Sequence, residues 1–227
     1  MRLALFDLDH TLLDGDSDVL WCEYLMDQGV LDRAAFAARN AAMEAAYRAG
    51  KVGAQAFSSF YVSTLAGRSP AGWEALRRDF LARVIVPRVP AAAHALVARH
   101  RDAGDLLVLT TATNRYLTEL TARHLGLEHL IATDCEIGAD GCFTGHPTGV
   151  LNMREGKVTR LHAWLAARGE TLADFHSTAY SDSINDLPLL QAVTQAVVVN
   201  PDARLAAEAQ VRGWPSCNLH AAMPTVR

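Results

Sequence analysis

The chain has 227 residues, enough for one large core or for a core with a smaller inserted domain, and its 50% hydrophobic and 20% charged composition is typical of a globular protein. A formal net charge of −4 and the lack of a run of Lys or Arg argue against a nucleic-acid partner. No apolar segment reaches the length that spans a bilayer, so we expect no membrane partner and a cytoplasmic location.

The first predicted element is a buried strand over residues 3–6, followed at once by two acids. Residues two apart in an extended chain point to the same side, so Asp7 and Asp9 can converge on one point, with Thr11 just beyond to support the loop. Two close carboxylates repel each other, so the pair favours a bound cation, a shared proton or both. On this stretch alone, a solvated turn rich in aspartate is an equal alternative.

Residues 15–85 are predicted to be helical and to contain no strand. Asp16 or Ser17 can cap the first helix, and Ser69 followed by Pro70 begins the last. The four predicted helices cover residues 17–28, 32–49, 54–66 and 70–84. We expect this block to be an inserted helical domain over the carboxyl edge of a sheet, where open α/β sheets bind ligands.

From residue 86 onward, apolar strands alternate with helices. The predicted strands cover residues 105–111, 130–133, 177–181 and 196–199, and the predicted helices cover residues 90–103, 114–124, 157–168, 183–191 and 202–210. Asp140-Gly141 predicts a hairpin turn. The alternation indicates a parallel sheet with helices on both faces. The predicted fold class is therefore α/β, with a core formed by residues 1–14 and 86–227 and a helical domain over residues 15–85.

Two further positions can share the sheet edge that carries the first acids. A hydroxyl followed by N–H groups at a helix start can bind an anion, which makes Thr111, Ala112 and Thr113 candidates for a phosphate site. Simple capping of the helix is the alternative. Lys157 begins a helix, where a cation opposes the helix dipole, so a nearby anion cluster explains it better than local stability does. An ordinary exposed lysine fits the local sequence equally well.

The last candidate positions are acids after another strand. Asp182 lies at the strand end and Asp186 follows one helical turn later on the same face, although a helix cap and a first-turn acid are the alternative. With Asp7 and Asp9, four carboxylates would then face one lysine, a set that requires a metal. Oxygen ligands with places for water suit Mg²⁺, and Mg²⁺ beside a lysine and an anion cradle indicates a phosphate ligand.

These motifs, taken in order, resemble the haloacid dehalogenase superfamily. The matching residues are Asp7-Leu8-Asp9-His10-Thr11 for DxDxT, Thr111 for the strand-end hydroxyl, Lys157 for the lysine, and Asp182 and Asp186 for the GDxxxD acids. Ser181 replaces the glycine of the last motif, a change that removes no carboxylate. The parts occur in the family's chain order and spread over nearly the whole sequence.

Other stretches resemble one branch of that family, the phosphoserine-phosphatase-like proteins, and within it the histidinol-phosphate phosphatase-like members. They are the Asp-Gly hairpin before Lys157, the segment Tyr180–Leu190, and Asn200-Pro201-Asp202 with Gly213-Trp214-Pro215. The helical insertion resembles the family's C1-type cap. The resemblance implies a three-layer Rossmann-like core with an inserted all-helical cap.

The resemblance also implies roles for the site residues. Asp7 would attack phosphorus and form an aspartyl-phosphate, and Asp9 would act as general acid and then general base. Mg²⁺ would be held by Asp7, the backbone carbonyl of Asp9 and Asp182, with Asp186 orienting a ligand water or binding weakly. The residues implied for the phosphoryl oxygens are Thr111, Lys157 and the N–H groups near Ala112 and Thr113.

The implied activity is that of a Mg²⁺-dependent phosphomonoesterase acting on a small phosphoserine-like or histidinol-phosphate-like metabolite. Asp16 matches the acid that related phosphoserine phosphatases turn toward the substrate's amino group, and Arg48 is a cap cation that could meet a substrate anion. A helix cap and an exposed helix face are the alternatives for these two residues. A phosphotransferase with the same aspartyl-phosphate, or a non-catalytic Mg²⁺/phosphate-binding module, stays open, as does the oligomeric state.

Overall fold

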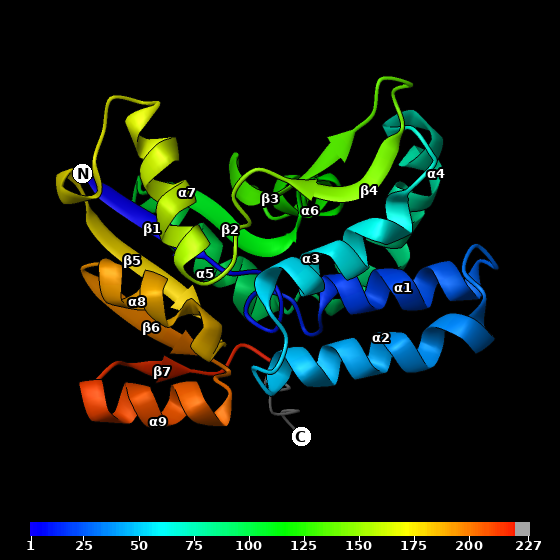
Figure 1. Ribbon diagram of the computed structural model, residues 1–227. Coiled ribbons are helices and arrows are strands. Elements are labelled where there is room, and N and C mark those ends of the chain that lie inside the picture. Colours follow the sequence, from blue (N-terminus) through cyan, green and yellow to red (C-terminus); the bar gives the residue numbers. More distant parts are fainter. Residues whose placement is uncertain (221–227) are drawn as a thin grey trace.

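A single mostly parallel sheet organises residues 1–220, the part of the chain that the computed structural model describes (Figure 1). Within these residues the strand order is β4-β3-β2-β1-β5-β6-β7, and β4 pairs with β3 in the antiparallel sense. The strands are β1 (Arg2–Phe6), β2 (Leu106–Asn114), β3 (His129–Ile137), β4 (Phe143–Thr148), β5 (His176–Ser181), β6 (Gln195–Val199) and β7 (Ser216–Cys217). The predicted α/β fold is confirmed.

Helices cover both faces of this sheet because its central strand is apolar on both sides. In β1, Ala4 and Phe6 belong to one buried cluster and Leu3 and Leu5 to another. The first cluster packs against α5 (Ala91–Asp102) and α6 (Arg115–His124). The second packs against α7 (Glu155–Ala166), α8 (Leu187–Ala192) and α9 (Ala203–Arg212). The arrangement has three layers, helix–sheet–helix.

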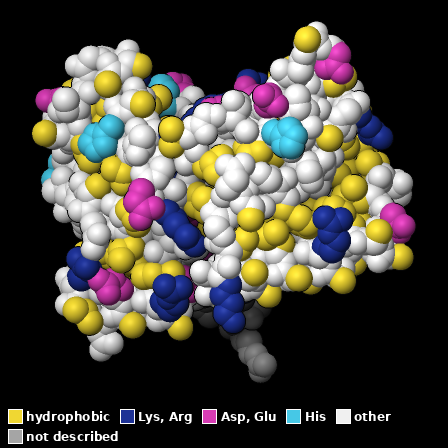
Figure 2. All heavy atoms as spheres, in the orientation of Figure 1, with side chains coloured by type: hydrophobic (Ala, Val, Ile, Leu, Met, Phe, Trp, Pro, Cys, Tyr) yellow, Lys and Arg dark blue, Asp and Glu magenta, His cyan; other side chains and the backbone are white. Residues whose placement is uncertain are grey.

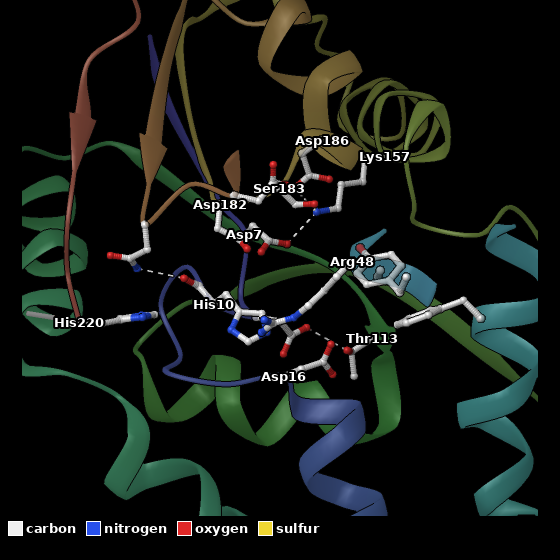
Figure 3. Close-up of a pocket in the computed structure, with 16 residues that line it drawn as sticks. Asp7, His10, Asp16, Arg48, Thr113, Lys157, Asp182, Ser183, Asp186 and His220 are labelled. Carbon is white, nitrogen blue, oxygen red and sulfur yellow. Dashed lines mark hydrogen bonds and ion pairs between the residues drawn. The ribbon is translucent and has the colours of Figure 1, made fainter. Parts of the chain in front are cut away.

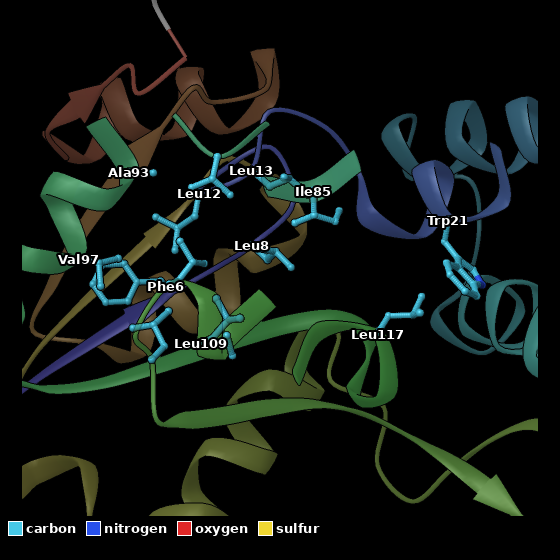
Figure 4. Close-up of a cluster of buried hydrophobic side chains, with 14 of the residues drawn as sticks. Phe6, Leu8, Leu12, Leu13, Trp21, Ile85, Ala93, Val97, Leu109 and Leu117 are labelled. Atoms are coloured by element: carbon cyan, nitrogen blue, oxygen red, sulfur yellow. The ribbon is translucent and has the colours of Figure 1, made fainter. Parts of the chain in front are cut away.

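The segment between β1 and β2 is helical, and it shares its core with the sheet. It contains α1 (Ser17–Asp27), α2 (Arg33–Arg48), α3 (Ala54–Val62), η1 (Ser63–Leu65), α4 (Pro70–Phe80), the π-turn η2 (Leu81–Ile85) and η3 (Val86–Arg88). Trp21 of α1 and Ile85 lie in the same buried cluster as Phe6 and Leu117 (Figure 4). This shared apolar contact fixes α1 and the π-turn η2 to the sheet.

The β3–β4 hairpin gives the helical segment a second attachment. The Phe143 N–H donates to the Arg68 carbonyl at 3.0 Å, and the Gly67 N–H donates to the Phe143 carbonyl at 2.9 Å. Gly145 has a φ of +85°, and a Cβ there would lie 2.9 Å from Cβ of Ala66. This close approach requires glycine.

Helix α2 lies on the outside of the segment and is the least buried of its helices. Asn40 is its one buried residue. Phe36, Met43 and Tyr47, predicted to share one face, pack together against a small cluster that contains Phe57 of α3. Much of the rest of α2 is alanine, and Figure 2 shows hydrophobic side chains over α1 and α2 on the face drawn.

Several boundaries differ from the sequence prediction. The second strand runs to Asn114, three residues further than predicted, and the strand predicted over residues 130–133 is part of the longer β3. The last helix of the 15–85 segment ends at Phe80 and continues as a π-turn. Pairing with neighbouring strands extends β2 and β3, and such pairing depends on residues distant in sequence.

The short elements η4 (Leu172–Asp174) and η5 (Ile184–Asp186) complete the described chain. Within residues 1–220, no single helix is long and apolar enough to cross a membrane. The pair Pro70–Arg88 and Ala91–Asp102, bent by 94°, meets the same length and composition test.

Candidate active site

A cavity of about 270 Å³ lies where the carboxyl ends of β1, β2, β5 and β6 meet the helical segment (Figure 3). In a parallel sheet these strand ends share one edge, so residues distant in sequence come together there. The lining residues are Asp7, Asp9, His10, Asp16, Tyr47, Arg48, Phe57, Ala112, Thr113, Lys157, Asp182, Ser183, Asp186, Asn200, Asp202 and His220. Apart from Thr111, every predicted site residue lines it.

Lys157 joins two of the predicted acids. Its Nζ atom lies 2.7 Å from Oδ1 of Asp7 and 2.6 Å from Oδ2 of Asp186, and the three side chains are buried. Burial raises the pKa of Asp7 to about 7, although Lys157 acts against the rise. Burial lowers the pKa of Lys157, but the carboxylates of Asp186 and Asp7 outweigh burial and raise it above its ordinary value. Lys157 is therefore a buried cation held between two carboxyl groups, and the alternative of an ordinary exposed lysine is wrong.

Asp186 has a second partner besides the lysine. Its Oδ2 accepts from the Ser181 hydroxyl at 2.7 Å, and Ser181 is the residue that replaces the glycine of the family motif. The substitution therefore adds a hydrogen bond that holds Asp186.

Thr11 connects Asp7 with Asp182. Its Oγ1 lies 3.2 Å from Oδ2 of Asp7 and 3.3 Å from Oδ1 of Asp182, and it accepts the Asp182 backbone N–H at 3.1 Å. One hydroxyl has one hydrogen, so it cannot satisfy both carboxylates. Burial, followed by the charges of Asp7 and Asp186, raises the pKa of Asp182 well above its ordinary value. Some carboxylate oxygens of Asp7 and Asp182 therefore lack a hydrogen-bond donor. A bound cation would stabilise these oxygens.

This donor set fits Mg²⁺ in chemistry. Asp7, Asp9 and Asp182 line the cavity and offer oxygen atoms, and hard oxygen ligands with room for water suit this ion. Within residues 1–220, no three His, Cys, Asp or Glu side chains are grouped closely enough to hold a metal by themselves. Backbone and water oxygens would therefore have to complete the coordination.

Asp9 is held by donors from two elements. Its Oδ1 accepts the Ser17 N–H at 2.7 Å, and its Oδ2 accepts from the hydroxyls of Thr111 at 3.2 Å and Thr113 at 3.0 Å. Asp9 therefore has a fixed orientation, facing the cavity beside Asp7.

At the end of β2, where the sequence predicts a phosphate site, the structure shows other partners for two of the predicted groups. Thr111 is fully buried, and its hydroxyl lies behind Asp9 instead of lining the cavity. The Thr113 N–H donates to Oγ1 of Thr111 at 3.1 Å, so it is not a free donor. Residues 112–114 remain in the strand, and Asn114 caps α6 by accepting from Leu117, so the chain does not turn around an anion at Thr111.

The opposite wall of the cavity comes from the helical segment. Asp16 caps α1, accepting from the N–H groups of Asp18 and Val19 at 3.0 Å each, and burial together with the Asp9 charge raises its pKa to about 8. Arg48 of α2 lies with NH2 3.0 Å from Nε2 of His10. Burial lowers the pKa of His10, so its neutral ring can accept from Arg48. Asp16 and Arg48, the two residues predicted to bind substrate, therefore both line the cavity.

Sequence reasoning missed part of this wall. His10 has a φ of +56°, and its carbonyl accepts from Nδ2 of Asn200 at 3.0 Å. Oδ1 of Asn200 accepts the Leu219 N–H at 2.9 Å, and Nε2 of His220 lies 3.2 Å from the Thr11 carbonyl. The segment around residue 219 therefore supports the loop that carries Asp7 and Asp9. The motif Asn200-Pro201-Asp202 could have indicated Asn200 as a site residue, but no local sequence pattern indicates His220.

Comparison with known proteins agrees with this geometry. The sequence model of the haloacid dehalogenase-like hydrolases matches residues 4–191. The chain is 41% identical over 218 residues to a histidinol-phosphatase of Neisseria meningitidis serogroup C (strain 8013), covering 96% of this chain and 98% of that protein. It is 34% identical over 219 residues to a phosphoserine phosphatase of Mycobacterium tuberculosis, covering 93% of this chain and 68% of that protein.

A solved structure is similar over nearly the full length. The crystal structure of a protein with unknown function from Bordetella pertussis Tohama I has a TM-score of 0.90 and 44% identity, covering 96% of this chain and 98% of that one. The family resemblance seen in the motifs is confirmed.

Proposed function

The chain belongs to the haloacid dehalogenase-like hydrolases, and from this premise we propose that it is a Mg²⁺-dependent phosphomonoesterase that works through an aspartyl-phosphate. The observation that carries the proposal is the convergence of Asp7, Asp9 and Lys157 on one cavity beside Asp182. A nucleophile, an acid/base and a cation for the phosphoryl group are then all within one site.

Asp7 supplies the nucleophile in this proposal. A carboxylate oxygen of Asp7 forms a bond to phosphorus as the bond to the substrate's ester oxygen breaks. Asp9 gives a proton to that leaving oxygen and afterwards takes one from water, whose oxygen attacks phosphorus and frees Asp7 and inorganic phosphate. Lys157 lies 2.7 Å from Asp7, close enough to stabilise charge on the phosphoryl oxygens.

Asp7, Asp182 and the Asp9 carbonyl would hold Mg²⁺. When bound, the ion supplies positive charge that offsets the crowded carboxylates and the phosphoryl oxygens. Asp186 keeps Lys157 in place at 2.6 Å and would orient the metal's water. Thr111 orients Asp9, while Ala112 and Thr113 form the cavity wall next to the phosphoryl position.

The substrate in this proposal is the phosphomonoester of a small amino alcohol, and histidinol phosphate is the first candidate. The histidinol-phosphatase of Neisseria meningitidis supports this choice because it matches over almost its whole length. Asp16 reaches the cavity and forms no ion pair with a cation within residues 1–220, so a substrate ammonium group fits there. Tyr47 and Phe57 offer an aromatic wall for an apolar or imidazole group.

Residues 15–85 would act as the cap that selects the substrate. Four of their side chains, from Asp16, Tyr47, Arg48 and Phe57, line the cavity opposite the nucleophile. None of these four side chains has a hydrogen bond or ion pair with Asp7, Lys157 or Asp182, so we expect changes in them to affect the choice of substrate more than the chemistry.

The test is phosphate release from p-nitrophenyl phosphate with Mg²⁺ for wild type, Asp7→Asn and Asp14→Asn. Asp14 is an acid of the same loop whose side chain is 69% exposed, so its variant should keep the wild-type rate. Asp7→Asn should lose activity, and acid-quenched wild type should carry phosphate on the peptide that contains Asp7. A silent wild type, or a fully active Asp7→Asn, would show that the proposal is wrong.

The substrate is then sought in a panel of histidinol phosphate, phosphoserine, sugar phosphates and nucleotides. Histidinol phosphate should have the highest kcat/KM. A higher value for a sugar phosphate or a nucleotide would contradict the substrate class while leaving the phosphatase chemistry intact.

A further inference from the structure

Thr113 has more hydrogen-bond partners than its hydroxyl can satisfy as a donor. Its Oγ1 lies 3.0 Å from Oδ2 of Asp9, 3.1 Å from Oδ2 of Asp18, and 3.2 Å from the Ser17 hydroxyl, which donates to it. A threonine hydroxyl has one hydrogen and two lone pairs. If both carboxyl groups were ionised, one of them would face the Thr113 oxygen with no hydrogen between them.

Of the two carboxyl groups, Asp18 has fewer hydrogen-bond donors that could stabilise a negative charge than Asp9 has. It is 2% exposed, and its other contact, with Nδ2 of Asn114, is long at 3.5 Å. Asp9 has two further donors, the Ser17 N–H and the Thr111 hydroxyl, and it lines the cavity. No ion pair within residues 1–220 includes Asp18.

The surroundings of Asp18 contain acids and neutral groups. The titratable groups that face it are Asp16 and Cys22 of α1, Asp9, Tyr61 of α3, and Cys135 of β3. Burial raises the pKa of Asp18 well above its ordinary value, and the charges of Asp16 and Asp9 add to the rise. The same burial raises the pKa values of Cys22, Tyr61 and Cys135, so these groups stay neutral and offer Asp18 no positive charge.

We infer that Asp18 is held as a neutral carboxylic acid that donates to Thr113, so that the Thr113 hydroxyl in turn donates to Asp9. In this arrangement Thr113 accepts from Asp18 and Ser17 and donates once, which uses its hydrogen and both lone pairs. Oδ1 of Asp18 remains the acceptor for Asn114. Every one of these contacts then has one hydrogen.

The inference rests on the proposed function for its consequence. Asp18 does not line the cavity, so it is a positioning residue, and it acts on Asp9 through Thr113. The direction of the Thr113 hydrogen holds Oδ2 of Asp9, the acid/base, in one orientation beside Asp7. Without the donor at Asp18, the Thr113 hydroxyl can turn away and Asp9 loses one of its three fixed contacts.

Three variants test the arrangement by activity on p-nitrophenyl phosphate. Asp18→Asn keeps both the acceptor for Asn114 and a donor to Thr113, so its kcat should stay within about threefold of wild type. Asp18→Ala and Thr113→Val should each lower kcat by about tenfold with KM within about twofold. Adding Asp18→Ala to Thr113→Val should cause little further loss, because both changes break the same chain.

A matched control separates this effect from lost stability. Asn40 is also buried beside α1 and donates to the Val19 carbonyl at 3.2 Å, but it does not touch Thr113 or the cavity. Asn40→Ala should lower the melting temperature while leaving kcat unchanged. A kcat for Asp18→Asn as low as that of Asp18→Ala, or full activity of Asp18→Ala, would overturn the inference.

A second measurement does not need activity at all. Below the ordinary Asp pKa, Asp18 is neutral in both the folded and the unfolded chain, so wild type and Asp18→Asn should have similar stability there. As pH rises, the unfolded wild type gains from ionising Asp18 and the variant does not, so the melting temperature of Asp18→Asn should exceed that of wild type by about 5 °C at pH 7.

The melting temperatures test the neutral Asp18, and phosphate release tests the proposed function, so failure of one can be told from failure of the other. A difference in melting temperature that stays flat or reverses with pH would show that Asp18 is ionised in the fold, which overturns the inference. If wild type releases no phosphate while the melting temperatures behave as expected, the neutral Asp18 stands and the proposed function fails.

Discussion

Nζ of Lys157 lies 2.6 Å from Oδ2 of Asp186, and the two side chains are 3% and 5% exposed. Asp186 is therefore bound to the lysine, and it lines the same cavity as the proposed metal ligands Asp7 and Asp182. The pair, with Asp7 on the other side of the ammonium group, places a fixed positive charge where the phosphoryl group would bind. Buried ions of this kind depend on one another, because an unpaired charge in the interior is costly.

Replacing Lys157 tests whether the buried carboxylates of Asp7 and Asp186 depend on its positive charge. Lys157→Met leaves Asp7 and Asp186 buried without a cation, and we expect the free energy of unfolding at pH 7 to fall by about 3–5 kcal/mol in urea titrations. The loss should be smaller at pH 5, because burial raises the pKa of Asp7 to about 7 and its carboxyl group can then bind a proton. Lys51→Met, at an exposed position, should have no effect, and Lys157→Met with Asp186→Leu should recover part of the loss. Wild-type stability of Lys157→Met at pH 7 would contradict the burial of these charges.

The residue before the lysine must be glycine. A Cβ on Gly156 would lie 2.0 Å from the Leu151 carbonyl oxygen, so Gly156→Ala has to move the backbone that begins α7. We expect at least a hundredfold loss of kcat/KM as Lys157 shifts. A Cβ on Gly72 in α4 would meet Oγ of Ser69 at 3.4 Å and Cβ of Arg68 at 3.8 Å, both of which it can accommodate. Gly72→Ala should therefore keep full activity and stabilise the helix by about 0.5–1 kcal/mol. Equal activity of the two variants would show that the turn tolerates a side chain.

Arg48 is predicted to affect binding more than turnover. It lines the cavity and contacts His10 at 3.0 Å, but it makes no hydrogen bond or ion pair with Asp7 or Lys157. For Arg48→Ala we expect KM for histidinol phosphate to rise by about fivefold, with kcat within about twofold. Arg39 is the matched control, because it lies on the same helix over the rings of Phe36 and Phe60, outside the cavity. A change confined to kcat would place Arg48 in the chemistry instead.

Mg²⁺ is predicted to stabilise the fold through Asp182. At about 100 times its Kd the ion should add about 2.7 kcal/mol, seen as a higher melting temperature, and EDTA should remove both the shift and the activity. Asp182→Asn should lose most of the shift, because its carboxylate is one of the proposed ligands. Asp102→Asn, whose side chain is 74% exposed, should keep it. An unchanged shift in Asp182→Asn would mean that the ion binds elsewhere.

Much of the fold follows from local patterns. The apolar stretch before Asp7 and the alternation of strands and helices after residue 86 predict a parallel sheet, because strands buried on both faces must be apolar throughout. The boundaries at Asn114 and Phe80 could not be predicted in the same way. They depend on pairing and packing with distant segments, which propensity does not describe.

For the site, the sequence by itself determined the acids, the lysine and the edge where they meet. Asp7, Asp9 and Asp182 follow strands, and Lys157 lies in the first turn of a helix. These strand and helix ends share one side of a parallel sheet, so topology alone brings the four residues together.

The tertiary structure decided which partners these groups have. Lys157 pairs with Asp186, Thr111 lies behind Asp9, Thr113 faces both Asp9 and Asp18, and His220 reaches the Thr11 carbonyl. Contacts between Thr113 and Asp18, or between His220 and Thr11, join residues about a hundred or more positions apart. Their geometry is set by the packing of whole helices and strands, and a sequence pattern carries no information on distances of that kind.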